Sequence, residues 1–269
     1  MSGYAETFRR LRSLRQRALI PFTVMGDPTF EKSLRVVQSL VRGGADILEL
    51  GVPFSDPIAD GPVIQAADVR ALRAGFKTAG LFRFIREVRK FTQVPIGLLL
   101  YYNIILQYGV ERFIQEGVKA GVNSLLVADL PPQEAGVFFQ LSKKNEMGTV
   151  FIVSELTDLE RLKKILKMTT AFVYIVSRLG VTGVRQDIQQ AVFQTLERIR
   201  PLTLLPLCVG FGISNPAQVS QVARGGADGV IVGSAIVKKI EALSARREMG
   251  LRVQQFVRQL KQPLIFKRA

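Results

Sequence analysis

Short apolar runs alternate along this chain with longer segments in which apolar residues recur at helical spacing. A short run bounded by glycine or proline is typical of a buried strand, whereas apolar residues every three or four positions indicate a helix. The expected strands cover residues 18–25, 47–52, 94–101, 123–128, 149–153, 171–176, 204–209 and 229–232. The expected helices cover residues 4–14, 30–43, 63–74, 79–91, 110–120, a segment capped by 129–132 and running to about 144, 157–167, 187–199, 215–224 and 248–260.

Eight strand–helix units follow one another at fairly regular intervals, which predicts an α/β fold with a parallel sheet. In a chain of 269 residues, eight such units favour a closed (β/α)8 barrel over an open doubly wound sheet, because such barrels have about 250 residues. We therefore expect residues 1–269 to form a single TIM-barrel domain. The amphipathic stretch 4–14 is expected to be an N-terminal helix that covers part of this domain, in preference to an Arg-rich targeting peptide.

A carboxylate interrupts the second apolar run. Glu49 lies inside residues 47–52, and the loop that follows adds Asp56 and Asp60. A charged group in the middle of a buried strand costs free energy unless it is paired or protonated. The stretch therefore predicts an acid/base site. The alternatives are a structural ion pair of Glu49 with a lysine or arginine, and turn capping by the two aspartates.

Polar side chains and glycines gather after the strands, where barrel enzymes place their chemistry. The polar candidates at strand ends are Glu49, Asp60, Tyr101, Asn103, Asp129, Tyr174, Ser177 and Thr182. The glycines that follow the last three strands are Gly180, Gly183, Gly210, Gly212 and Gly233. Glycine lets backbone N–H groups approach an anion, and a helix opening at Ser234 would point its N-terminus at it. We expect an extra short phosphate-binding helix after the eighth strand, although ordinary turn glycines are the alternative.

The charge balance is strongly basic, with 37 Lys and Arg against 22 Asp and Glu and a net charge of +15. Such a charge suggests nucleic acid or an acidic surface as a partner. Apart from residues 9–17, however, the basic residues are scattered along the expected helices, and no nucleic-acid-binding motif accompanies them. We therefore expect no nucleic-acid partner and regard the basic residues as solvated faces of an outer helical ring.

The chain has little or no histidine, cysteine and long apolar sequence, which argues against some classes of protein. The chain has no histidine, which argues against a transition-metal site and leaves acid/base chemistry to Asp, Glu, Tyr or Lys. Its one cysteine, Cys208, cannot form an internal disulfide, so a reducing compartment, the cytoplasm, is expected. No run approaches the roughly 18 apolar residues of a membrane span, so we expect no membrane association.

Several motifs resemble the tryptophan synthase α subunit family, in the right order and over almost the whole chain. They are PFTVMGDP at 21–28, LELGVPFSDPIADGPVIQ at 48–65, VADLPP at 127–132, SRLGVTG at 177–183, GFGIS at 210–214 and VGSAIV at 232–237. The segment 48–65 is specific to that family, whereas the glycine motifs occur more widely in phosphate-binding barrels.

The resemblance implies a lyase that cleaves indole-3-glycerol phosphate to indole and glyceraldehyde 3-phosphate by a retro-aldol reaction without metal or cofactor. It implies that Glu49 is the general acid/base, that Asp60 binds the indole N–H, and that Tyr174 lies near the reacting end. The implied substrate-binding residues are Phe22, Leu99, Thr182 and Phe211, and the implied phosphate-binding residues are Gly183, Gly212, Gly233 and Ser234. From the residues alone, Phe22, Leu99 and Tyr174 would be interpreted as barrel filling. Glu49 on an apolar wall should have a raised proton affinity, whereas Asp60 in a polar loop should stay ionised.

The resemblance also implies a partner, a β subunit that holds pyridoxal phosphate (PLP) and receives indole through a tunnel in an α2β2-type complex. The loops at 53–60, 102–109 and 129–135 match the family's contact region.

Some residues depart from the family pattern, chiefly in the loop 184–190, and also at Leu179, Ile104 and Tyr102. A loop altered in this way could close poorly over substrate and reduce turnover. The alternative hypotheses are a weakly active or noncatalytic scaffold that activates the β subunit, and another phosphate-binding barrel enzyme.

Overall fold

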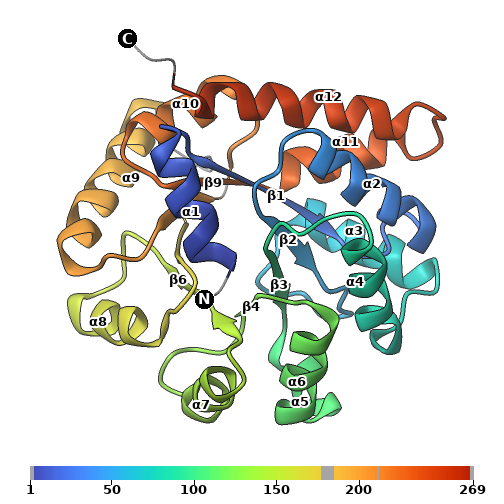
Figure 1. The fold of residues 1–269 in the computed structure, drawn as a ribbon, viewed down its shortest axis with the longest axis horizontal. Helices are drawn as coiled ribbons and strands as arrows, with labels where there is room; N and C mark the ends of the chain where they lie inside the picture. Colours follow the sequence, from blue (N-terminus) through green and yellow to red (C-terminus); the bar gives the residue numbers. More distant parts are fainter. Residues whose placement is uncertain (1–2, 177–184, 211, 267–269) are drawn as a thin grey trace.

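The strands of this protein form one closed parallel barrel (Figure 1). The computed structural model describes residues 3–176, 185–210 and 212–266. Within this part of the chain the strands are β1 (Ala18–Val24), β2 (Leu48–Gly51), β3 (Ile96–Leu100), β4 (Ser124–Val127), β5 (Gly148–Thr149), β6 (Phe151–Val153), β7 (Val173–Val176), β8 (Leu207–Gly210) and β9 (Gly229–Val232).

The order around the sheet is β5-β4-β3-β2-β1-β9-β8-β7-β6. Its two end strands, β5 and β6, are neighbouring pieces of one apolar run that are separated only by Val150. The N–H of Val150 donates to the carbonyl oxygen of Leu125 at 3.0 Å, which continues the pairing of this run with β4. The sheet therefore closes on itself through that run, and the predicted eight-stranded barrel is confirmed.

The two faces of each strand pack into two different apolar layers. Side chains alternate along a strand, so every second residue points into the barrel. The residues inside the barrel form one cluster: Ala18, Ile20, Ile47, Leu126, Val150, Tyr174, Cys208 and Ile231. Their neighbours, such as Leu19, Leu48 and Leu50, belong to the layer between the barrel and its helices.

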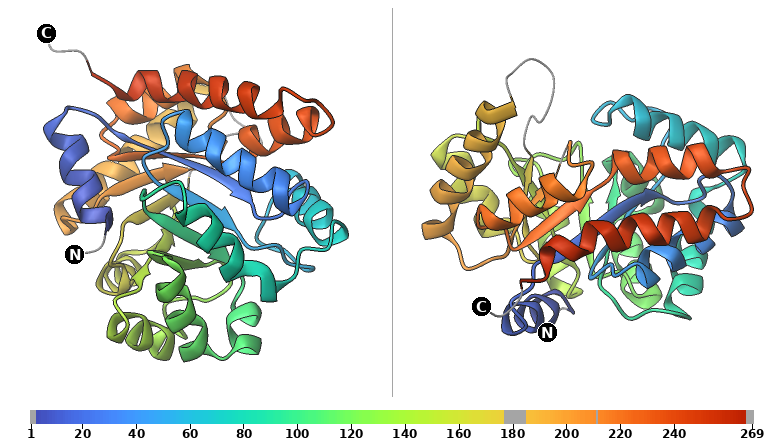
Figure 2. Two further views of the ribbon diagram at one scale, coloured as in Figure 1. Left: turned by 45° about the vertical axis from the view of Figure 1, so that its right-hand side comes forward. Right: turned by 90° about the horizontal axis from the view of Figure 1, so that it is seen from above.

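Apart from α1, the helices surround the barrel as an outer ring (Figures 1 and 2). The α-helices are α1 (Gly3–Ser13), α2 (Phe30–Arg42), α3 (Pro62–Arg73), α4 (Leu81–Arg89), α5 (Tyr102–Tyr108), α6 (Val110–Ala120), α7 (Gly136–Lys144), α8 (Leu159–Met168), α9 (Arg185–Ile199), α10 (Pro216–Arg224), α11 (Ser234–Leu243) and α12 (Met249–Lys261). The short 3-10 helices are η1 (Thr78–Gly80), η2 (Arg200–Leu202) and η3 (Gln262–Leu264). The expected short helix after the eighth strand is α11.

Two local predictions were wrong. Residues 102–109 were expected to be a loop, but most of them form α5. Asp129 was expected to cap the helix that follows it, yet α7 begins only at Gly136. The Asp129 carboxylate instead accepts a hydrogen bond of 2.7 Å from the N–H of Tyr102, the first residue of α5. A short carboxylate satisfies whichever free helical N–H lies nearest in space, and here that N–H belongs to the preceding βα unit.

The helix α1 closes the barrel at the N-terminal ends of its strands, as the prediction of a covering helix required. Its buried face, Tyr4, Phe8 and Leu11, joins the cluster inside the barrel. The Tyr4 hydroxyl hydrogen-bonds at 2.7 Å with the hydroxyl of Ser124, the first residue of β4. Side chains therefore fill the barrel at this end, so a cavity can open only at the C-terminal ends of the strands.

A buried ion pair fastens the last helix to the same end of the barrel. The Nζ atom of Lys261, the last residue of α12, lies 2.6 Å from the Asp46 carboxylate. Asp46 also accepts a hydrogen bond of 2.9 Å from the N–H of Leu19 in β1. The end of α12 is thus tied to β1 and to the residue that precedes the β2 run.

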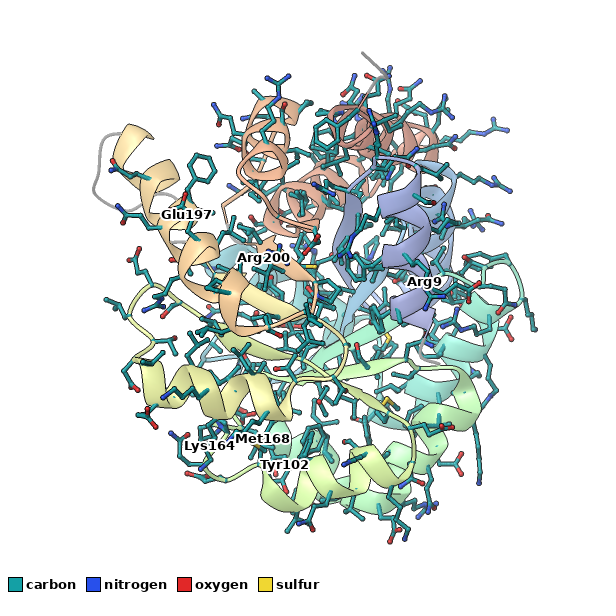
Figure 3. The ribbon with its side chains drawn as sticks, turned by 60° about the vertical axis from the view of Figure 1, so that its left-hand side comes forward. Arg9, Tyr102, Lys164, Met168, Glu197 and Arg200 are labelled. Atoms are coloured by element: carbon teal, nitrogen blue, oxygen red, sulfur yellow. The ribbon has the colours of Figure 1, made fainter. Side chains whose placement is uncertain are left out.

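Basic side chains project outward from several of the outer helices, and Figure 3 shows many nitrogen-tipped side chains around the molecule. Some of the described lysines pair with an acid one helical turn earlier, as Lys163 does with Glu160 at 2.8 Å. None of the described helices combines the length and the apolar composition needed to cross a membrane.

We predict that Tyr4→Phe lowers the free energy of unfolding by about 1–2 kcal/mol, because the buried Ser124 hydroxyl loses this hydrogen bond. Denaturant unfolding of the two proteins measures the difference. Ser13→Ala is the matched control, since it removes an exposed hydrogen bond from Ser13 to the Arg10 carbonyl oxygen on the same helix. An equal effect of both substitutions would contradict a specific role of Tyr4 in closing the barrel.

Candidate active site

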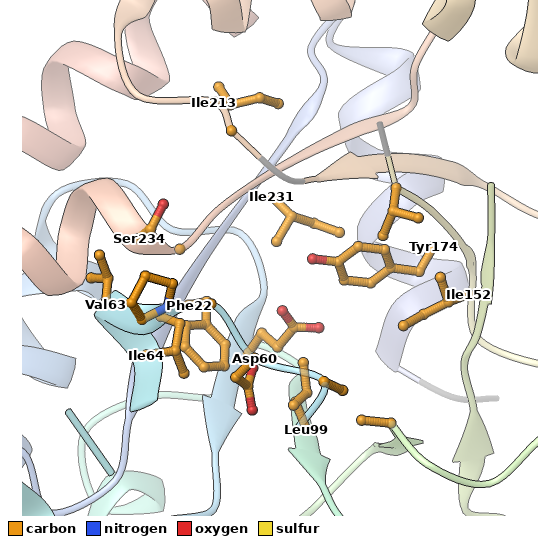
Figure 4. A pocket seen from close by; sticks show the side chains of 18 residues that line it. Phe22, Asp60, Val63, Ile64, Leu99, Ile152, Tyr174, Ile213, Ile231 and Ser234 are labelled. Atoms are coloured by element: carbon orange, nitrogen blue, oxygen red, sulfur yellow. The ribbon is translucent and has the colours of Figure 1, made fainter. Parts of the chain in front are cut away.

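A cavity of about 330 Å³ opens at the C-terminal ends of the strands. Eight residues singled out from the sequence line it together: Phe22, Glu49, Asp60, Leu99, Tyr174, Gly212, Gly233 and Ser234. Figure 4 shows Phe22 and Ile64 on one side of this cavity, with Tyr174 and Ile152 facing them from the other. The walls are mostly apolar, so the cavity suits a flat apolar ligand that also carries a few polar groups.

Two glycines at strand ends make room for the aromatic walls. A Cβ atom at Gly51 would lie 2.7 Å from the Phe22 ring, and one at Gly210 would lie 2.6 Å from the Tyr174 hydroxyl oxygen. Both distances are shorter than a non-bonded contact allows. Any larger residue would push these rings toward the cavity, so Gly51 and Gly210 help to set its shape.

Glu49 reaches the cavity from inside the barrel and is only 4% exposed. It is in register with Phe22 of β1 and Gly97 of β3, both of which belong to the inner face. Its Oε2 atom has no hydrogen-bond partner within the described part of the chain. Burial, together with the nearby charge of Asp60, raises the pKa of Glu49 to about 8. This acid therefore holds its proton near neutral pH, in the direction predicted, and the described residues give it no salt bridge.

Asp60 faces the same cavity in a different environment. The Tyr101 hydroxyl donates a hydrogen bond of 2.7 Å to its carboxylate and accepts one of 3.0 Å from the N–H of Ala59. Burial raises the pKa of Asp60, and the bond from Tyr101 opposes that rise. The Tyr101 ring stacks on Phe54 with centroids 4.9 Å apart, which steadies the donor. Of the two acids, Asp60 is thus the one whose ionised form is supported by a hydrogen bond.

A third carboxylate, Asp68 on α3, is buried beside this pair. Burial and the charge of Asp60 raise its pKa to about 8, and a hydrogen bond from the backbone N–H of Phe54 opposes them. Asp68 therefore ties the loop that carries Asp60 to the helix that follows. The sequence analysis missed it, although Asp68 shares the buried side of α3 with Ala67 and Ala71, a position where a carboxylate is unusual.

The far end of the cavity is built from backbone. Gly212 has φ of +74°, a conformation that side-chain-bearing residues rarely adopt. Gly233 precedes α11, and Ser234 is its first residue, so the free N–H groups of that helix start at the cavity wall. A helix N-terminus of this kind attracts anions such as phosphate.

Of the predicted site residues, Thr182, Gly183 and Phe211 lie outside the described residues, and so do the further candidates Ser177 and Gly180. Residue 184 and the side chains at 185–189 lie outside them as well, and with them the prediction about the atypical loop at 184–190. The sequence analysis missed several apolar lining residues: Val63, Ile64, Ala128, Ile152, Val176, Ile213 and Ile231. Their apolar character gave no signal, because it equally suits a core position.

The described residues include no group of three or more His, Cys, Asp or Glu side chains arranged to hold a metal ion. What the cavity offers is a protonated acid, a second acid whose carboxylate accepts a hydrogen bond, an apolar slot between aromatic walls, and an anion-binding end. Such a set can move a proton onto and off a flat substrate that is held at its other end by a phosphate.

Comparison with known proteins points to the same chemistry. The family model described as tryptophan synthase alpha chain matches residues 8–264. The tryptophan synthase alpha chain of Methanothermobacter thermautotrophicus is 47% identical over 249 residues, which cover 93% of this chain and 91% of the relative. The crystal structure of tryptophan synthase subunit alpha from Legionella pneumophila matches with a TM-score of 0.90 at 34% identity, covering 98% of both chains.

A chain in the crystal structure of the tryptophan synthase complex from Pyrococcus furiosus matches with a TM-score of 0.83 at 38% identity, covering 91% of this chain and 98% of that one. The agreement extends over nearly the full length in both sequence and fold, and it includes the segments that build the cavity. This chain is therefore a member of the tryptophan synthase alpha chain family.

Proposed function

We propose that this cavity cleaves indole-3-glycerol phosphate to indole and glyceraldehyde 3-phosphate. The observation that carries the proposal is the pairing of Glu49, a buried acid with a raised pKa, with Asp60, a carboxylate held by Tyr101, on one apolar cavity. The two environments suit the two roles that the reaction needs, namely a proton donor and a stabiliser of positive charge.

In the proposed mechanism, Glu49 donates its proton to the indole carbon that bears the glycerol chain. Asp60 accepts a hydrogen bond from the ring N–H and stabilises the positive charge that develops on the ring. Glu49, now ionised, takes the proton of the hydroxyl next to the scissile bond. The carbon–carbon bond then breaks, its electrons return to the ring, and the aldehyde forms as indole leaves. Glu49 regains its proton in the cycle, so the chain itself needs no cofactor.

The remaining roles follow the layout of the cavity. Phe22, Leu99 and Tyr174 would enclose the indole ring, and Gly212, Gly233 and Ser234 would hold the phosphate. Thr182 and Phe211 as substrate-binding residues, and Gly183 as a phosphate-binding residue, rest on the family resemblance alone.

A β subunit is the partner of chains in this family, and PLP belongs to that subunit. Each of the three segments expected to contact it presents an exposed aliphatic side chain within the segment or two residues beyond it. These are Ile58, which is 85% exposed, Leu106 in α5, and Val137 at the start of α7. We propose that these side chains face the β subunit, that indole passes to it for tryptophan synthesis, and that the complex works in the cytoplasm.

A weakly active or noncatalytic scaffold was the alternative suggested by the loop at 184–190. No feature of the described cavity favours it, since Glu49 and Asp60 are both in place.

We predict that Glu49→Gln lowers the rate of indole release by about 100-fold or more, because the substitution removes the proton that is transferred. Release from indole-3-glycerol phosphate is measured with and without a β subunit. In the assay without a β subunit, Asp56→Asn is the matched control, since Asp56 lies in the same loop as Asp60 and does not line the cavity. Clear stimulation of the β reaction by a native chain that releases no indole would favour the scaffold instead.

The raised pKa of Glu49 also predicts how stability changes with pH. Between its ordinary value of 4.5 and about 8, the folded state holds a proton that the unfolded state has lost. Stability from this group is therefore present in full below pH 4.5 and is lost as the pH rises to about 8. The free energy of unfolding of the native chain should be lower at about pH 8 than at about pH 5, by an amount on the order of a few kcal/mol from this group. Glu49→Gln should abolish this difference. Parallel pH profiles for the two proteins would contradict a buried, protonated Glu49.

We predict that Ile58→Asp weakens binding of the β subunit about tenfold, because a charge replaces an apolar side chain that becomes buried in the complex. Titration of the β subunit, followed by its activity, measures the effect. Leu204→Asp is the control, since Leu204 is 99% exposed and precedes β8 at the opposite end of the barrel. Equal weakening by both substitutions would argue against a contact at Ile58.

A further inference from the structure

Arg70 connects three parts of the chain through both edges of its guanidinium group. Its Nε and Nη2 atoms donate hydrogen bonds of 2.9 and 3.0 Å to the two carboxylate oxygens of Asp27. Its Nη1 atom donates one of 2.7 Å to the Glu241 carboxylate. Asp27 is fully buried in the turn after β1, whereas half of the Glu241 side chain is exposed. Only arginine can serve two carboxylates in this fixed geometry.

The two helices that Arg70 joins both begin at the cavity. The first residues of α3, Pro62 and Val63, line it directly after Asp60, and Ser234 at the start of α11 lines it as well. Figure 4 shows Val63 and Ser234 on the same side of the cavity. The acid end and the phosphate end of the candidate site are thus held by two neighbouring helix starts.

Arg70 and Glu241 lie at equivalent distances along these helices. Arg70 follows Val63 by seven residues, and Glu241 follows Ser234 by seven residues. Seven residues make about two helical turns, or roughly 10 Å. The ion pair therefore joins the two helices behind the cavity, and Asp27 fastens the same guanidinium to the barrel.

We propose that Arg70 is a positioning residue, which fixes α3 and α11 relative to each other so that one substrate can reach the acids and the phosphate site together. This inference rests on the proposed function. The affinity of a ligand that binds at only one helix start depends on the local geometry there. The affinity of a ligand that spans both helix starts depends also on how the two helices are placed relative to each other, so loosening that placement weakens its binding.

The test compares ligands that span the cavity with ligands that do not. The spanning probe is an indole with a three-carbon phosphate chain at its third carbon and no hydroxyls, which cannot be cleaved. The two fragments are indole and glycerol 3-phosphate. The variants are Glu241→Gln, which removes the charge from the bond between the helices, and Arg70→Lys, which keeps a charge beside Asp27 but loses the two parallel hydrogen bonds.

We expect Glu241→Gln to weaken binding of the spanning probe about two- to fivefold, the range of an exposed ion pair, and Arg70→Lys to weaken it about tenfold or more. Each fragment should keep its affinity to within about twofold. The control Glu160→Gln, which removes the charge from a 2.8 Å pair with Lys163 inside α8, should change none of these values. A role in stability alone would move the melting temperature without separating the probe from its fragments.

Unchanged binding of the spanning probe in both variants, or parallel losses for the probe and both fragments, would overturn the inference. Failure of the native chain to bind the spanning probe is a different result. That result would contradict the proposed function, and with it the role of Arg70 that rests on that function.

Discussion

In a closed barrel each strand must turn one of its two faces inward, and the inner space must be filled or left as a cavity. This constraint places Glu49 where it is, because its neighbours Leu48 and Leu50 occupy the outer layer. A carboxyl group on the inner face has lost most of its water, so it keeps its proton to a higher pH. The same alternation brings Phe22, Leu99 and Tyr174 to the inner face around it. The chemistry of the cavity therefore depends on the closure of the sheet.

The two ends of the barrel are used differently. At the N-terminal ends of the strands, α1 fills the interior, and the buried pair of Lys261 and Asp46 fastens the last helix. At the C-terminal ends, glycines and helix starts leave space, and the polar groups face it. Stability and function are thus separated along the barrel axis, so that the charged groups of the site lie where the core is already open.

The acids of the site act on one another. Glu49, Asp60 and Asp68 lie close enough that the charge of Asp60 raises the pKa of both others. Tyr101 stabilises the charge on Asp60, and Arg70 stabilises that on Asp27 nearby. These two hydrogen bonds offset part of the cost of burying a charge on Asp60 and on Asp27. Glu49, whose Oε2 atom has no donor among the described residues, is left with a proton to transfer.

The amino-acid sequence determined the succession of strands and helices, and hence the barrel, because hydrophobic periodicity is a local property. It also determined the acids, glycines and motifs that place the chain in its family. It could not assign Asp129 to α5 or pair Arg70 with Glu241, because both depend on which helices meet in space. The sequence also could not show that Ile152 and Ile231 line the cavity, since the same apolar residue fills a core or lines a cavity according to its depth in the barrel. Only the closed tertiary structure, which sets distances between residues far apart in the chain, decided these contacts.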